Sequence, residues 1–429
     1  MSTMQEVLVT SDAAGQQWNS SIWDPVAGTS LLTFKGSTSA PHTLSILSNE
    51  YLLGALPTKS VIQVWSLQKT DNTQMQIVCP GRVTSLTTTP DGHYCIAAVS
   101  ENIHIWQVCT GHLLTVLSRH YQQIKCIKCT DDGTCFVTAG DDNLVIAWTL
   151  AKVLADCGNP SHQVEPDHVW SHHSLPVTDL FIGSGGNRAR VVSSSLDQTC
   201  KMYDLVSGDL LCNLVFDVSI TSVTMDTAEY RLFAGGSNGV IHCIEMFEMP
   251  VQKDRHIEKE SEDIACFEGH KKQVTCLCVS INGSQLISGA DDCNVKIWDV
   301  FSGQCTKTLD HKGILTNVFL IPMPPALLDF NLPRNCIIKP FQRHLYIPGE
   351  QTDESDGTVT MMFNNSEKIE SVVDYMSDVS SYLSQNTELS DPAEELAKCK
   401  EEIARLKSVN HKLFQFAAKE ILHQDDQIT

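Results

Sequence analysis

Asn294-Val295-Lys296-Ile297-Trp298-Asp299 is a short run of alternating polar and apolar residues that closes on a Trp-Asp pair, and a Gly-His pair, Gly269-His270, precedes it. Runs that close on Trp or Tyr recur along the chain. The first four closing residues are 42, 41 and 42 residues apart: Trp23, Trp65, Trp106 and Trp148. Self-similarity at a fixed period of ~40–45 residues is typical of WD repeats, in which each repeat forms one four-stranded blade of a β-propeller. The spacing therefore predicts an all-β fold.

Three more blades follow when the closing residue is allowed to vary. Tyr203 closes the fifth, Ile244 occupies the equivalent position in the sixth, and Trp298 closes the seventh, at steps of 55, 41 and 54 residues. The two long steps contain polar segments, residues 156–167 and 252–263, which we expect to be surface loops. The sequence thus predicts a seven-bladed WD40 β-propeller in the first 322 residues.

The first blade lacks one strand at the N-terminal end. Only three strand-like segments, residues 6–10, 19–24 and 30–34, precede the second blade. His311, followed by the apolar run 315–321, repeats the spacing found at the start of the seventh blade. We therefore expect residues 315–321 to pair beside the N-terminal strands and to close the ring, because closure leaves no open sheet edge between the first and last blades.

Three blades carry a further pattern of polar residues in fixed register. A His lies before the first strand, and a Ser or Thr on the second strand lies four residues before an Asp, which lies six residues before Trp or Tyr. We interpret each set as a buried hydrogen-bonded relay that stabilises its blade. A catalytic triad is the alternative, but packing would bury all three sets. The sets are His120, Thr138, Asp142 and Trp148; His173, Ser193, Asp197 and Tyr203; and His270, Ser288, Asp292 and Trp298.

Composition excludes several classes of function. The chain has 429 residues and a formal net charge of −21, to which residues 350–395 contribute −11 through twelve acidic residues and one Lys. An acidic body argues against direct nucleic-acid binding, which needs clustered Lys and Arg. No apolar run of ~18 residues that could span a membrane is present, and we expect a soluble intracellular protein.

Most of the 17 cysteines lie singly in apolar strand segments, which is typical of buried thiols in a reducing compartment. Cys126 and Cys129 have the spacing of a zinc-binding pair, but no second Cys or His pair follows at ligand distance. The sequence therefore predicts no metal site, no cofactor and no catalytic residue.

Beyond the propeller we expect an acidic, Pro- and Ser-rich linker, residues 323–387, that is mostly disordered. A C-terminal helix is expected over residues 388–423, with Ser390 and Pro392 at its start. Its apolar residues form a heptad seam in which Asn410 falls on an a position, and this favours a parallel homodimeric coiled coil. A single amphipathic helix folded back on the propeller is the alternative. The seam comprises Leu396, Cys399, Ile403, Leu406, Asn410, Leu413 and Ala417.

Four longer strings go beyond the general WD pattern: Leu117-Ser118-Arg119-His120-Tyr121-Gln122, His168-Val169-Trp170-Ser171-His172-His173, Ser194-Ser195-Leu196-Asp197-Gln198-Thr199 and Phe216-Asp217-Val218-Ser219-Ile220. Together they resemble the WD repeat-containing protein 18 family. The resemblance covers the propeller and the C-terminal helix but not the linker. It implies a non-catalytic scaffold subunit of a nuclear complex needed for pre-rRNA processing at the internal transcribed spacer, and for maturation and nuclear transit of the large (60S) ribosomal subunit.

The same resemblance implies a set of partners. They are a Pro/Glu/Leu-rich helical-repeat scaffold protein, a second helical-repeat subunit, an AAA-type ATPase on the pre-60S particle and a SUMO protease, in addition to a second copy of this chain. It also implies the nucleus, both nucleolus and nucleoplasm, as the place of action, with the cytoplasm as a further location.

Two alternatives stay open at this point. One is a WD40 substrate receptor or general interaction platform in a ubiquitin ligase or SUMO-protease assembly. Receptors for cullin-type ligases resemble one another in an Arg shortly after the Trp-Asp pair, and that Arg is absent after Trp23-Asp24 and Trp298-Asp299. The other is an enzyme, but the Gly-rich string Gly183-Ser184-Gly185-Gly186 lacks the Lys and the Ser or Thr of a phosphate-binding loop.

Overall fold

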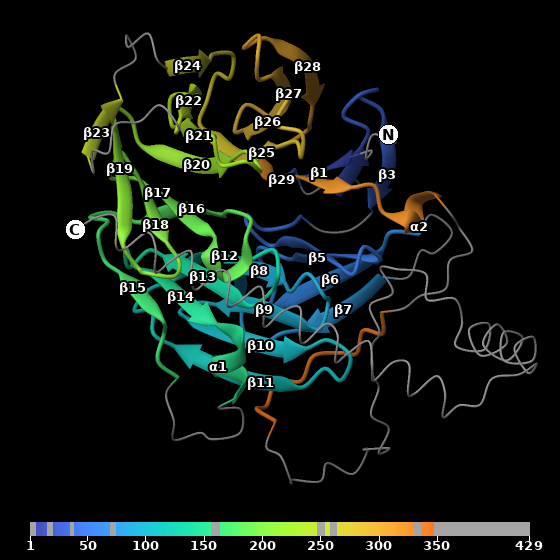
Figure 1. Cartoon of the computed structure of the whole chain (residues 1–429). Coiled ribbons are helices and arrows are strands. Elements are labelled where there is room, and N and C mark those ends of the chain that lie inside the picture. The colour runs from blue at the N-terminus through green and yellow to red at the C-terminus, as the bar shows by residue number, and fades with distance from the viewer. Residues whose placement is uncertain are drawn as a thin grey trace, which may run out of the picture. The chain divides into compact units, whose positions relative to one another are not determined.

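The computed structural model describes residues 6–14, 20–34, 38–68, 74–155, 164–246, 254–257, 264–328 and 336–346. Their strands form seven sheets, which are the blades of a propeller (Figure 1). The expected seven-bladed all-β propeller is confirmed. The expected C-terminal helix, with the whole seam from Leu396 to Ala417, lies outside the described residues. No helix within the described ranges is long and apolar enough to cross a membrane.

In every blade the first strand contributes to the wall of the central channel and the following strands lie further out. Blade one contains β29 (Leu315–Pro322), β1 (Glu6–Asp12), β2 (Ser20–Trp23) and β3 (Ser30–Phe34), in that order. Blade two contains β4 (Leu44–Leu47), β5 (Tyr51–Ala55), β6 (Val61–Ser66) and β7 (Gln74–Val78). Blade three contains β8 (Val83–Thr88), β9 (Tyr94–Val99), β10 (Asn102–Gln107) and β11 (Leu113–Ser118).

The remaining four blades follow in chain order. Blade four contains β12 (Ile124–Cys129), β13 (Cys135–Gly140), β14 (Val145–Thr149) and β15 (His168–Trp170). Blade five contains β16 (Val177–Ile182), β17 (Arg190–Ser195), β18 (Thr199–Asp204), β19 (Leu210–Phe216) and β23 (Asp254–Ile257). Blade six contains β20 (Ile220–Met225), β21 (Arg231–Gly236), β22 (Ile241–Glu245) and β24 (Ile264–Phe267). Blade seven contains β25 (Val274–Val279), β26 (Gln285–Ala290), β27 (Asn294–Asp299) and β28 (Cys305–Asp310).

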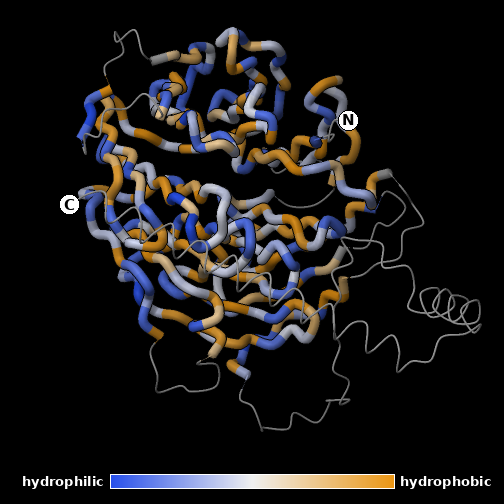
Figure 2. The backbone as a smooth tube through the Cα atoms, in the orientation of Figure 1, coloured by the Kyte–Doolittle hydropathy of each residue, from blue (hydrophilic) through white to orange (hydrophobic). Residues whose placement is uncertain are grey.

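Within the described ranges, the core is divided among seven hydrophobic clusters, each of which joins one blade to its neighbour. Apolar residues accordingly run through the strands of all blades (Figure 2). The residue that closes each repeat from the second to the seventh lies in the cluster shared with the preceding blade: Trp65, Trp106, Trp148, Tyr203, Ile244 and Trp298. The sequence period therefore reflects one bulky side chain that every interface between blades requires.

The strand that completes blade one comes from the far end of the propeller. β29 lies beside β1 (Figure 1) and pairs with it antiparallel, with Leu8 opposite Leu320 and Thr10 opposite Val318. This is the segment that we expected to close the ring. A buried hydroxyl contact of 2.7 Å between Ser11 Oγ and Thr316 Oγ1 adds to the ladder.

One of the two long steps between repeats differs from a simple surface loop. β23 lies within the expected loop 252–263 and pairs parallel with β19, as a fifth strand of blade five. Ile257 is buried against blades five and six, and Asn213 Nδ2 donates to Asp254 Oδ1 at 2.8 Å. The loop prediction is therefore wrong for β23. In the other long step, the short helix α1 (Leu150–Ala155) precedes residues 156–163, which lie outside the described ranges.

The expected linker, residues 323–387, also contains ordered segments. The short helix α2 (Pro325–Leu328) packs Ala326 and Leu327 into the cluster between blades one and two. Residues 336–346, which we name the strap, lie along blade three, where the N–H of Tyr346 donates to the carbonyl of Leu113 at 2.8 Å. The disorder prediction does not hold for these two segments, because their apolar side chains complete interfaces between blades.

The strap also supplies a partner that blade three lacks. Trp106 Nε1 donates to the carbonyl of Gln342 at 2.9 Å, and the Phe341 ring stacks on Trp106 with centroids 5.3 Å apart. In blades four and seven the equivalent Trp donates to a Thr or Ser hydroxyl of its own blade. In blade three the strand register places Ala97, which has no hydroxyl, at that position. The strap carbonyl therefore satisfies an indole N–H that would otherwise be buried without an acceptor.

We predict that a chain shortened after Asp310 loses cooperative folding. Its loss of β29 would leave β1 as an exposed edge strand and remove one side of two clusters. A chain shortened after Tyr346 retains every described element and serves as the control. Circular dichroism melting and size-exclusion chromatography should show an aggregated or unfolded species only for the shorter chain, and equal melting temperatures would contradict the prediction.

Candidate functional site

The relay residues of blade four are brought together by three neighbouring elements. His120 precedes β12, Thr138 lies on β13, and Asp142 lies in the turn that follows β13. His120 Nδ1 is 2.8 Å from Asp142 Oδ2, and His120 Nε2 is 2.9 Å from Thr138 Oγ1. Trp148 Nε1 donates to Thr138 Oγ1 at 3.2 Å. All four sequence-predicted residues of this set therefore lie in one hydrogen-bonded chain.

Blade seven joins its four residues in the same way, and blade five joins its His, Asp and Ser likewise. His173 bonds Asp197 at 2.9 Å and Ser193 at 2.6 Å. Tyr203 occupies the Trp position in blade five and is fully buried. In blade seven, His270 bonds Asp292 at 3.0 Å and Ser288 at 2.7 Å, while Trp298 Nε1 donates to Ser288 Oγ at 2.8 Å.

The turn that carries each Asp explains why this residue type is needed there. The second carboxylate oxygen accepts the backbone N–H two residues further on: Leu144 for Asp142, Thr199 for Asp197 and Asn294 for Asp292. Such a bond stabilises a turn whose next residue adopts a positive φ, between 64° and 67° in the three blades. Each Asp therefore shapes its turn with one oxygen and orients its His with the other.

Burial and hydrogen bonding act in opposite directions on these carboxyl groups. Burial opposes ionisation of Asp292, but the hydrogen bond with His270 and the backbone N–H groups of Lys271 and Asn294 outweigh it and hold its pKa below the ordinary value. Asp142 and Asp197 have lowered pKa values for the same reasons. Burial lowers the pKa of His270, although Asp292 opposes this shift. The relay of blade seven is therefore a neutral imidazole beside a carboxylate.

The geometry resembles a catalytic triad but does not expose a nucleophile. With Nδ1–H donating to Asp, Nε2 accepts the proton of the Ser or Thr hydroxyl. The side chains of Thr138, Ser193 and Ser288 are fully buried, and in blades four and seven the hydroxyl oxygen already accepts the indole N–H. No substrate could reach these oxygens without unfolding the blade. The relays consequently stabilise structure.

Blade one holds a partial relay that sequence reasoning missed. Trp23 Nε1 donates to Thr10 Oγ1 at 2.9 Å, and the ring of His311 packs edge-on against Trp23 at 5.6 Å. Asp12 Oδ2 lies 3.8 Å from His311 Nδ1. The set escaped detection because Asp12 lies two residues after the hydroxyl residue instead of four, and because His311 comes from the other end of the propeller.

A closed circle of hydrogen bonds joins the seven blades around the channel. Each bond joins a residue in or just before the first strand of one blade to a residue of an adjacent blade. The bonds are Asn317 Nδ2 to Ala40 O (2.9 Å), Ser85 Oγ to His42 O (3.1 Å), Ile127 N to Ser85 Oγ (2.9 Å), Cys126 Sγ to Thr178 O (3.2 Å), Val223 N to Asp179 Oδ2 (3.1 Å), Ser222 Oγ to Val274 O (3.3 Å) and Cys276 Sγ to Thr316 O (3.4 Å).

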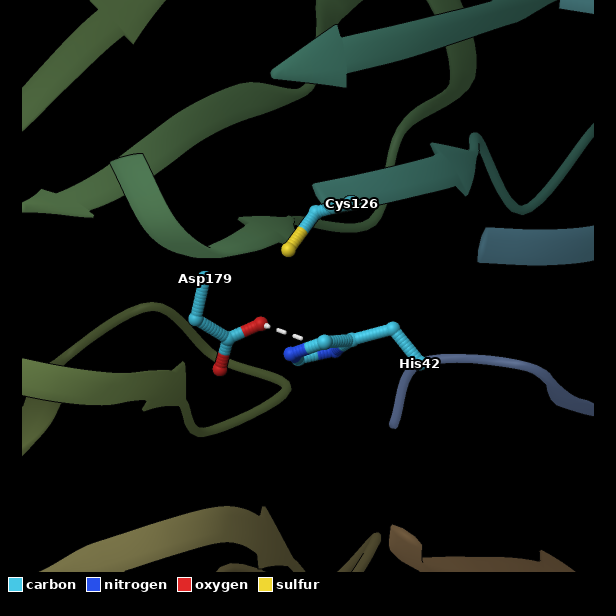
Figure 3. A group of neighbouring side chains, drawn as sticks. All are labelled: His42, Cys126 and Asp179. Carbon is cyan, nitrogen blue, oxygen red and sulfur yellow. Dashed lines mark ion pairs between the residues drawn. The ribbon is translucent and has the colours of Figure 1, made fainter. Parts of the chain in front are cut away.

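Three of these residues also converge on one point in the channel, as Figure 3 shows. His42, Cys126 and Asp179, which we name the channel cluster, offer one nitrogen, one sulfur and one oxygen atom that all lie within 4.8 Å of one another. A cavity of about 310 Å³ adjoins the cluster, and first strands of blades one to five and seven contribute to its wall. Sequence reasoning missed this cluster because its members come from blades two, four and five.

The channel cluster is an unusual electrostatic environment. Burial lowers the pKa of His42, and Asp179 only partly opposes this effect, so the imidazole is neutral at physiological pH. Burial raises the pKa of the Cys126 thiol well above its ordinary value. His42 Nδ1 and Asp179 Oδ1 are 3.7 Å apart, beyond hydrogen-bonding distance.

The fold, the repeat period and the three complete relays define a WD-repeat β-propeller. The family model described as "WD domain, G-beta repeat" matches residues 111–149, 164–204 and 261–299, and each of these segments contains one relay.

Relatives extend the likeness to the whole chain. The chain is 41% identical to "WD repeat-containing protein 18" of Mus musculus over 428 residues, and 40% identical to the Homo sapiens protein of that name over 432 residues. Each alignment covers 98% of both chains. The chain therefore belongs to the WD repeat-containing protein 18 family. It is also 26% identical to "Pre-rRNA-processing protein pro-1" of Caenorhabditis elegans over 326 residues, which cover 74% of this chain and 61% of that protein.

We predict that Asp292→Ala lowers the free energy of unfolding by about 1–3 kcal/mol, because it leaves His270 Nδ1 without its acceptor and removes the turn bond to Asn294. Asp209→Ala, the same substitution at an exposed position, should change it by less than about 0.5 kcal/mol. Urea unfolding followed by circular dichroism would measure both, and equal losses would contradict a stabilising relay.

The relay should also make stability depend on pH. A carboxyl group whose pKa is lowered in the folded state stabilises that state at any pH above its pKa in the unfolded chain, about 3.8. This contribution is lost as the pH falls through the pKa of the folded state. The difference in urea midpoint between the natural protein and Asp292→Ala should shrink below pH 4, as the Asp292 carboxylate is protonated. A difference that stays the same between pH 5 and pH 2 would contradict the assignment.

Proposed function

We propose that this chain is a non-catalytic scaffold subunit that acts in pre-rRNA processing at the internal transcribed spacer and in maturation and nuclear transit of the large (60S) ribosomal subunit. The observation that carries the proposal is the likeness to WD repeat-containing protein 18 over 98% of both chains. A more distant relative is named as a pre-rRNA-processing protein, which points to the same process.

The burial and hydrogen bonding of the polar groups favour a scaffold function and not an enzymatic one. The relay hydroxyls are buried, and each relay His has both ring nitrogens engaged. The Cys126 thiol is fully buried, and its raised pKa disfavours the nucleophilic thiolate. WD propellers typically serve as platforms for other proteins, and this chain fits that use.

Exposed apolar side chains give the propeller surfaces for partners. Because strands alternate in direction within a blade, the loops before the first strands lie on one face and the turns after the first strands on the other. Tyr121, 84% exposed, lies on the former face, before β12. Tyr230, 60% exposed, Ile281 and Phe301, 73% exposed, lie on the latter, on blades six and seven.

The second group forms a connected patch, which we name the blade 6–7 patch: Tyr230, Arg231, Ile281 and Phe301. The Arg231 guanidinium lies 5.0 Å from the centroid of the Phe301 ring, and Thr227 Oγ1 donates to the carbonyl of Ile281 at 2.9 Å. Exposed aromatic residues beside Arg are typical of residues that dominate protein interfaces. We propose this patch as one contact with a helical-repeat subunit.

The proposed assembly follows from the family resemblance. Its members are a Pro/Glu/Leu-rich helical-repeat scaffold protein, a second helical-repeat subunit and an AAA-type ATPase on the pre-60S particle, with a SUMO protease as a further partner. A homodimer through the seam from Leu396 to Ala417 and action in the nucleolus and nucleoplasm belong to the same proposal. A substrate receptor of a ubiquitin ligase is the rival.

Depletion of the protein from cells tests the proposal. We expect precursors that retain the internal transcribed spacer to accumulate on RNA blots, and large subunits to decrease. Re-expression of the natural protein or of Tyr121→Ser, on the opposite face, should restore processing, whereas the double variant Tyr230→Ser, Phe301→Ser should not.

Each other outcome has a defined meaning. Unchanged precursors after depletion would overturn the function. Equal rescue by both variants would exclude the blade 6–7 patch as an essential contact and leave the function standing. Capture of cullin adaptors in place of ribosome-precursor proteins by the tagged chain would favour the rival receptor.

A further inference from the structure

We propose that the channel cluster, His42, Cys126 and Asp179, binds one Zn²⁺ ion. Each ligand comes from a different blade: His42 precedes β4, Cys126 lies on β12 and Asp179 lies on β16. Figure 3 shows the three side chains directed toward one another, with the imidazole facing the carboxylate. Imidazole nitrogen, thiolate sulfur and carboxylate oxygen are the ligand types that zinc takes in proteins.

The distances suit a tetrahedral ion. Zinc–ligand bonds of about 2.0–2.3 Å place neighbouring ligand atoms of a tetrahedral site roughly 3.3–3.8 Å apart. His42 Nδ1 and Asp179 Oδ1 are separated by 3.7 Å, and all three ligand atoms lie within 4.8 Å of one another. The His42–Asp179 separation is too long for a hydrogen bond and close to the separation of two ligands of one ion.

The surrounding backbone holds the ligands in place. The N–H of Leu180 donates to Asp179 Oδ1 at 2.8 Å, and the N–H of Val223 donates to Oδ2 at 3.1 Å. The His42 carbonyl accepts bonds from Ser85 Oγ and from the N–H of Leu86. Such outer contacts fix the orientation of ligands and reduce the reorganisation that binding requires.

The ion would meet two negatively charged ligands, beside Lys128, which also lines the cavity. Zinc binding breaks the S–H bond of Cys126, and with it the hydrogen bond from Sγ to the Thr178 carbonyl, forms a sulfur–zinc bond and releases the proton to solvent. The ion would then link blades four and five in place of that hydrogen bond. The ion then carries two positive charges against one thiolate and one carboxylate. The imidazole of His42 is neutral and needs no proton release. The adjoining cavity of about 310 Å³ has room for a water molecule as the fourth ligand.

The full-length protein provides the test. After treatment with a chelator and dialysis, the protein is titrated with Zn²⁺, and bound metal is measured by plasma mass spectrometry. We expect one zinc ion per chain and a higher melting temperature with zinc than without. Substitution with Co²⁺ should produce the intense near-ultraviolet absorption of a cobalt–thiolate bond.

Variants separate the cluster from other possible ligands. Cys126→Ser should abolish the cobalt–thiolate absorption, and His42→Asn should weaken zinc binding by at least about tenfold. Asn suits position 42, where the backbone has a φ of 54°. Cys276→Ser, at the same level of the channel wall but outside the cluster, is the matched control and should retain both signals.

The proposal fails if the folded natural protein binds no zinc. It also fails if His42→Asn, checked by circular dichroism for native structure, binds zinc as tightly as the natural protein. His42→Asn therefore tests whether the channel cluster binds zinc even if Cys126→Ser does not fold. The test is independent of the proposed role in rRNA processing.

Discussion

The circle of hydrogen bonds around the channel constrains the whole propeller, because it requires seven blades to meet at fixed angles. Each first strand offers a small or polar residue, such as Ser85, Cys126 or Ser222, to the neighbouring blade. The antiparallel pairing of β29 with β1 completes the circle. Blade one therefore combines three N-terminal strands with one strand that follows blade seven in the sequence. Packing at each junction and closure of the ring are therefore coupled.

Outside the circle, the blades tolerate variation because each junction has more than one means of support. Blades four, five and seven combine an apolar cluster with a complete relay. Blade six has Ala234 at the hydroxyl position and Ile244 in the aromatic position, and it relies on apolar packing. Blade three obtains the acceptor for Trp106 from the strap. Equivalent positions therefore meet the same physical need with different chemistry.

Sequence reasoning could predict what is periodic or local. The closing residues from Trp65 to Trp298 recur because each packs on the preceding blade, and the relays recur because a turn and a strand fix their spacing. β23 and the strap could not be predicted in this way, since each pairs with a strand distant in the sequence and carries no period. The channel cluster escaped for the same reason, because closure of the ring alone brings His42 near Asp179.

The strap also determines where the chain departs from the propeller. Tyr346 is bonded to Leu113 on β11, the outermost strand of blade three, so the last described residue lies at the rim of that blade, not near the channel. Among the described segments, the strap therefore sets blade three apart from the blades that supply an acceptor for their own Trp.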